Sequence, residues 1–139
     1  MGEIIPTTDS DTAVPADCFR DKAREMYASQ DAAIIQHESD GLQAAHHYFA
    51  NGITHFTRRI SRCISLGCAD REAAPFVGHN AFIRWSAVQD ASFIDEADGK
   101  RKQWSESNVP EDFGLVLRLL LKGYTPWWAT YSEGGSRKE

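Results

Sequence analysis

The first residues suited to chemistry are two carboxylates near the start of the chain. Asp9-Ser10-Asp11 places them one residue apart, directly after the short apolar stub Ile4-Ile5-Pro6. Carboxylate oxygens at this spacing can bind a hard divalent cation such as Mg²⁺ or Mn²⁺, and a bound cation can hold a diphosphate. The segment also fits a polar turn in which Asp11 or Thr12 caps the following helix.

A second acidic pair, Glu111-Asp112, follows Pro110 at the predicted start of a helix. One of these carboxylates could act as a general base toward an acceptor hydroxyl if it faces a cleft. Acidic side chains also stabilise the N-terminus of a helix through its dipole. The pair alone therefore fits both a catalytic and a structural role.

A polar step, Gly78-His79-Asn80, interrupts two apolar segments. Glycine lets another group approach the backbone closely, and the two polar side chains could contact a ligand. A turn whose polar groups are satisfied within the chain fits the same pattern.

The composition indicates one globular domain. The chain has 139 residues, of which 42% are hydrophobic and 25% charged, and its net charge is −5. This balance argues against a nucleic-acid binder that works through a basic surface. We find no secretory signal, and the longest apolar stretch, residues 113–121, is cut by Arg118 and is shorter than the roughly 18 residues of a membrane span.

Hydrophobic periodicity predicts alternating helices and strands, and hence an α/β layer. We expect strand 32–36 to be buried on both faces, since Ile34 and Ile35 are adjacent. In the last helix we expect the inward residues to be Phe113, Leu117, Leu120 and Leu121. The predicted helices are 15–29, a long one from Leu42 to its end at Gly67, and 110–122; the other predicted strands are 75–78, 81–85 and 124–131.

Taken in order, these segments resemble the family 2 glycosyltransferase domain, in particular its fungal cellulose-synthase-like and chitin-synthase-like branch. The resemblance runs from residue 9 to residue 135. DSDTAVPADCF (9–19) resembles the family's DxD segment, and AIIQHESD (33–40) resembles its next strand. PFVGHNAFIRW (75–85) resembles the acceptor-side strand and turn. WSESNVPEDFGLVLRLLLKGY (104–124) resembles the Glu-Asp catalytic segment, and WATYSEGG (128–135) resembles the strand after it.

The resemblance implies that residues 1–139 form a single, partial GT-A (Rossmann-like) domain, with a mostly parallel sheet flanked by helices. The implied reaction is the inverting transfer of a sugar from a UDP-sugar to a glycan or another hydroxyl acceptor. The donor and the acceptor would be the partners, and Mg²⁺ or Mn²⁺ the cofactor.

The resemblance also assigns roles to the residues singled out above. Asp9 and Asp11 would hold the metal and the diphosphate of the donor. Asp112 would be the catalytic base, with Glu111 supporting the start of the helix. The acceptor side would be lined by Gly78, His79 and Asn80.

The family's nucleotide-binding strands upstream of the DxD segment and its downstream QxxRW motif have no counterpart in this sequence. We therefore expect a domain truncated at both ends, with an exposed sheet edge through which it could associate. The alternative function is that of a catalytically inactive remnant acting as a scaffold or partner-binding fragment. The family's parents are membrane proteins with a cytoplasmic catalytic domain, whereas the sequence itself leaves localisation unknown.

Overall fold

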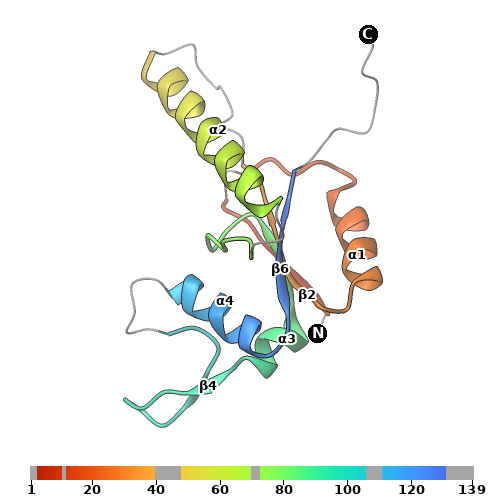
Figure 1. Ribbon diagram of the computed structural model, residues 1–139, viewed down its shortest axis with the longest axis vertical. Coiled ribbons are helices and arrows are strands. Elements are labelled where there is room, and N and C mark those ends of the chain that lie inside the picture. The colour runs from red at the N-terminus through yellow and green to blue at the C-terminus, as the bar shows by residue number, and fades with distance from the viewer. Residues whose placement is uncertain (1–2, 11, 40–47, 70–72, 106–110, 131–139) are drawn as a thin grey trace.

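The computed structural model describes residues 3–10, 12–39, 48–69, 73–105 and 111–130. Helices and strands alternate along most of the chain, as the periodicity predicts (Figure 1). In chain order the elements are β1 (Ile4–Thr7), α1 (Cys18–Ala28), β2 (Ala32–His37), α2 (Tyr48–Cys68), β3 (Ala81–Arg84), α3 (Trp85–Asp90), β4 (Phe93–Ile94), β5 (Arg101–Lys102), α4 (Glu111–Leu121) and β6 (Thr125–Ala129).

The main sheet has the strand order β1-β3-β2-β6. The α/β class, with helices packed on a sheet, is confirmed, but the expectation of a mostly parallel sheet is wrong. β1 with β3 and β3 with β2 are antiparallel pairs, and only β2 with β6 is parallel. Parallel pairing needs a long crossover, and the chain from β2 to β6 supplies one. The short strands β4 and β5 form a separate antiparallel hairpin.

Both faces of the sheet are covered. On one face, Ile34 and Ile83 belong to a core cluster with residues of α3 and α4. On the other face, Ile35 and Phe82 pack with Met26 of α1. Every residue of β2 is buried, which confirms the expectation that this strand is covered on both sides.

Helix α4 presents a different side to the core from the one expected. Its buried residues are Leu115, Val116 and Leu119. The residues expected to point inward are 38–86% exposed: Phe113, Leu117, Leu120 and Leu121. The helix is apolar on several sides, so the sequence pattern alone does not fix which side meets the sheet.

The C-terminal end of α1 is fixed to the sheet by Arg84. This residue is 3% exposed, and its guanidinium donates to the backbone carbonyls of Ala32 (3.1 Å), Ser29 (3.1 Å) and Met26. Because carbonyls at a helix C-terminus lack intrahelical partners, a buried cation there is well placed. Arg84 also lies 3.4 Å from the carboxylate of Glu3.

Two further segments differ in kind from the rest. The strand expected at 75–78 is a loop, since the Val77 amide bonds the side chain of Gln36 rather than a neighbouring strand. Helix α2 contacts β6 and extends away from the sheet (Figure 1). Within the described part of the chain, none of the helices combines the length and apolar content needed to cross a bilayer.

Candidate active site

The Asp9 carboxylate lies in a turn that follows β1. The Thr12 amide donates to the Asp9 carbonyl (3.1 Å), which closes the turn and leaves the Asp9 side chain 58% exposed. Asp11, the second carboxylate of the expected metal pair, lies outside the described residues.

His79 brings the loop after residue 77 to Asp9. Its Nδ1 atom is 3.5 Å from Oδ2 of Asp9, although these are separated by seventy positions in the chain (79 minus 9). This Nδ1 is buried and makes no hydrogen bond to any described residue. The predicted donor side and the predicted acceptor side are therefore in contact.

Gly78 brings the same loop to the start of α4. Its φ is +83°, a conformation that L side chains rarely adopt. A Cβ built on this residue would lie only 2.5 Å from Oδ2 of Asp112. Glycine is required here both for the backbone conformation and for the close approach of the carboxylate.

The surroundings of Asp112 favour a basic carboxylate. The pKa of this carboxyl is raised above its ordinary value, mainly by burial and also by the charge of Glu111. The hydrogen bond from Trp104 and the charge of His79 lower the pKa, but they do not cancel the rise. Trp104 Nε1 donates to Oδ1 at 3.3 Å, while Oδ2 faces Gly78. A carboxylate with a raised pKa is a stronger general base than one in water.

Asn80 connects three separate segments. Its φ is +54°, a left-handed conformation that asparagine tolerates better than most residues. Its side-chain carbonyl accepts from Thr12 Oγ1 (3.1 Å), and its amide nitrogen donates to Ser39 Oγ (2.7 Å). The amide thus links the Asp9 turn to the end of β2, and its contact with an acceptor stays a prediction.

Gln36 holds the loop in place, and the sequence analysis did not single it out. Its side chain is completely buried; Oε1 accepts from the Val77 amide (3.1 Å), and Nε2 donates to the carbonyls of His79 (2.8 Å) and His37 (3.2 Å). One signal could have revealed it, because a glutamine inside the apolar strand AAIIQH must find buried hydrogen-bond partners.

Glu111 shares the first turn of α4 with Asp112 and is half-buried. This position fits the supporting role expected for it, since an acidic side chain complements the helix N-terminus.

The donor chemistry of Asp9 suits a hard cation, because its exposed carboxylate offers oxygen ligands. The described residues contain no group of three or more His, Cys, Asp or Glu side chains that could hold a metal ion. Asp9 therefore fits as one ligand, and the metal pair expected from the sequence stays a prediction.

Together, the turn after β1, the loop at 78–80 and the start of α4 place a carboxylate on either side of His79. This arrangement can bind a cationic or polar group on the Asp9 side and accept a proton on the Asp112 side.

Comparison with known proteins identifies the family of this chain. A search of curated proteins returned no match. A family model described as "Glycosyl transferase family group 2" matches residues 4–139, a range that includes Asp9, His79 and Asp112. Because the match covers nearly the whole chain, the protein belongs to glycosyl transferase family group 2.

Proposed function

We propose that this protein transfers a sugar from a UDP-sugar to a hydroxyl of a glycan or another acceptor, with inversion at the anomeric carbon. Family membership supports glycosyl transfer between a nucleotide-sugar donor and an acceptor. The observation that carries the proposal is the convergence of Asp9, His79 and Asp112 from three distant segments.

Asp112 is the proposed base. It takes the proton of the acceptor hydroxyl while that oxygen forms a bond to the anomeric carbon, and the bond from this carbon to the donor diphosphate breaks. The raised pKa supports this role, and the Trp104 hydrogen bond fixes one oxygen so that the other is directed toward Gly78. Attack from the side opposite the leaving group gives inversion.

Asp9 is the proposed donor-side residue, together with Asp11. These carboxylates would hold Mg²⁺ or Mn²⁺, which neutralises the charge that develops on the UDP leaving group. His79 lies between the donor-side and base carboxylates and is proposed to contact the acceptor, with Gly78 and Asn80 shaping that side of the site.

The resemblance to cellulose-synthase-like and chitin-synthase-like proteins suggests which substrates to test. UDP-glucose and UDP-N-acetylglucosamine would each be incubated with cello- and chito-oligosaccharides and Mn²⁺, and the configuration of the new linkage would be determined by NMR. We expect transfer with a β-linkage from an α-linked donor, and an α-linkage would contradict the inverting mechanism.

A matched pair of variants separates base catalysis from misfolding. Asp112→Asn keeps the size of the side chain and an oxygen that can accept from Trp104, but it removes the base. Glu111→Gln makes the same chemical change one residue away. Transfer that survives Asp112→Asn would overturn the assignment of the base.

A further inference from the structure

Helix α2 buries polar residues and exposes apolar ones. Thr54 and Ser61 are 5% and 6% exposed, whereas most of the large apolar residues of the helix are at least 44% exposed. A surface helix normally buries its apolar stripe in the core, so this orientation is the reverse of the usual one. An exposed apolar stripe of this kind marks an interaction surface.

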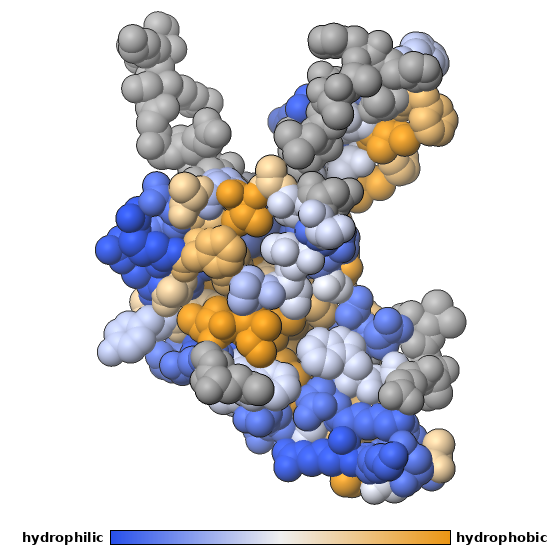
Figure 2. Space-filling view, turned by 180° about the vertical axis from the view of Figure 1, so that it is seen from behind, coloured by the Kyte–Doolittle hydropathy of each residue, from blue (hydrophilic) through white to orange (hydrophobic). Residues whose placement is uncertain are grey.

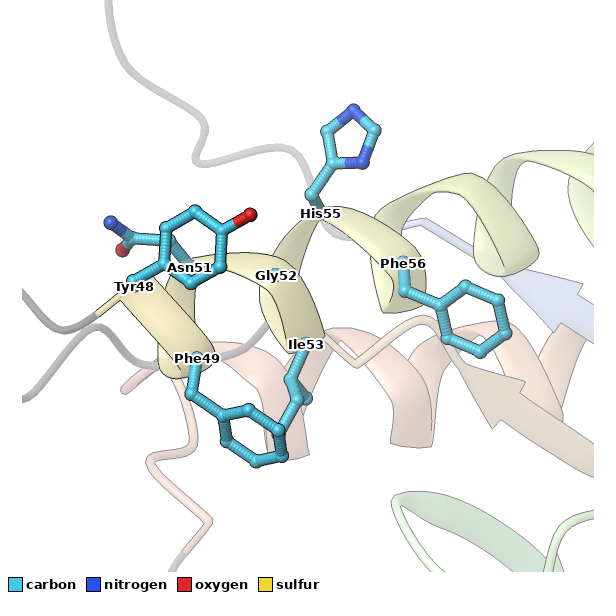
Figure 3. A pocket seen from close by; sticks show the side chains of 7 residues that line it. All are labelled: Tyr48, Phe49, Asn51, Gly52, Ile53, His55 and Phe56. Carbon is cyan, nitrogen blue, oxygen red and sulfur yellow. The ribbon is translucent and has the colours of Figure 1, made fainter.

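The exposed apolar residues lie along one side of α2. Phe49, Ile53, Phe56 and Ile60 are spaced by four, three and four positions and are 44–70% exposed. We call these four residues the α2 stripe. Figure 3 shows Phe49, Ile53 and Phe56 extending from the same side of the helix, with His55 on another side.

Three residues of the α2 stripe, Phe49, Ile53 and Phe56, border a hollow of about 510 Å³. The described residues that line it all belong to α2, from Tyr48 to Phe56. The apolar side chains of this helix stand clear of the body of the protein in the space-filling view (Figure 2). The hollow shares no residue with the Asp9, His79 and Asp112 site.

The charge of α2 differs from that of the whole chain. Between Tyr48 and Cys68 the helix has Arg58, Arg59 and Arg62 and not one Asp or Glu, although the net charge of the chain is −5. Arg59 and Arg62 are exposed. An apolar stripe combined with arginines and without acids is typical of helices that lie on anionic lipid surfaces.

We propose that α2 binds to an anionic lipid surface, with the α2 stripe inserted at the interface and the arginines near lipid phosphates. Helical spacing places the arginines on other sides of α2 than the stripe, which is the arrangement of an interfacial amphipathic helix.

The proposal is tested by co-sedimenting the full chain with phosphatidylcholine vesicles, with and without phosphatidylglycerol. We expect binding to the anionic vesicles that weakens as salt is raised. Ile53→Ser with Phe56→Ser should weaken it at least about tenfold, because two apolar side chains no longer insert. Arg59→Glu with Arg62→Glu should weaken it by about tenfold or more at low salt.

The matched control changes exposed apolar residues outside α2. Tyr27 and Leu121 are 80% and 86% exposed, and Tyr27→Ser with Leu121→Ser should leave vesicle binding within about twofold. Circular dichroism confirms that each variant is folded.

Several outcomes would overturn the proposal. Failure to bind anionic vesicles would do so, as would equal binding to neutral vesicles or equal loss in the control variant. Self-association that the α2 stripe variant abolishes, measured by analytical ultracentrifugation without vesicle binding, would assign the surface to a second copy instead.

Discussion

The carboxylate of Asp112 lies against the backbone of Gly78, with Oδ2 only 2.5 Å from the place a Cβ would occupy. The first turn of α4 and the 78–80 loop can therefore approach one another only while residue 78 is glycine. The same loop carries His79 to Asp9, so this contact helps to keep the base side and the donor side of the site together.

Gly78→Ala should destabilise the fold and displace the Asp112 carboxylate. Gly99→Ala is the matched control, since Gly99 also has a positive φ (+67°) but its Cβ would meet no atom within 4 Å. Both variants suffer backbone strain, and only Gly78→Ala adds the clash. We expect its free energy of unfolding to fall by about 1–3 kcal/mol more than that of Gly99→Ala, measured by urea denaturation. Equal losses would mean that the close approach to Asp112 does not matter.

Asp112→Asn should lower the rate of sugar transfer by about 10²- to 10⁴-fold, because the base is lost. Glu111→Gln should cost less than about tenfold. In the wild type, transfer should decline as pH falls through the raised pKa of Asp112, where the base becomes protonated. A pH profile that is the same in both variants and the wild type would contradict this role.

The same carboxylate should reduce stability at neutral pH. Its pKa is raised above the ordinary 3.8 mainly by burial, so the folded state binds this proton more tightly than the unfolded state does. The protonated Asp112 therefore contributes to the stability of the fold below about pH 4. This contribution is lost as pH rises through the pKa of Asp112 in the folded state. The free energy of unfolding of Asp112→Asn should equal or exceed that of the wild type at pH 7. The difference between the two should become smaller as pH falls. An advantage that grows in acid would contradict the direction of the shift.

His37 should make the protein sensitive to acid. Burial, together with the charge of Lys22, lowers the pKa of this imidazole from 6.5 to about 4. The unfolded chain binds the proton more readily, so stability is lost as pH falls from about 6.5 toward 4, by up to about 3 kcal/mol. His37→Gln should flatten this loss in urea denaturation. The exposed His55→Gln is the control, and a slope unchanged in His37→Gln would contradict the prediction.

Gln36→Leu should loosen the loop that carries His79. It leaves the Val77 amide without its side-chain acceptor, at a cost of about 1–3 kcal/mol in the free energy of unfolding. Gln36→Glu keeps the acceptor but loses the donation to the His79 carbonyl and buries a charge, so it should cost more. Gln30 bonds the Tyr27 carbonyl at the surface, and Gln30→Leu should cost less than about 0.5 kcal/mol. Equal costs at both sites would show that the Gln36 bonds hold nothing in place.

Much of the fold could be predicted because periodicity reports local structure directly. The two-sided burial of β2 follows from adjacent isoleucines, and α4 begins at the acidic pair, as expected. Strand direction could not be predicted, since apolar runs look alike in parallel and antiparallel pairs. The orientation of α2 could not be predicted either, because an apolar stripe normally predicts the buried side.

The candidate site was predictable in its residue types and not in its connections. Asp9, His79 and Asp112 could be selected for their chemistry, but their convergence depends on long-range packing. Trp104 could not be paired with Asp112 from the sequence, because aromatic residues usually pack in the core.

The proposed function requires that this chain bind a nucleotide-sugar donor through Asp9 and a divalent cation. UDP would be titrated into the protein with and without Mn²⁺, followed by tryptophan fluorescence and by calorimetry. We expect saturable binding that requires Mn²⁺, weakens at least about tenfold in Asp9→Asn with Asp11→Asn, and is retained in Asp112→Asn. If the folded protein does not bind UDP, or binds it equally well without the metal and the aspartates, the claim is contradicted and the non-catalytic alternative is favoured.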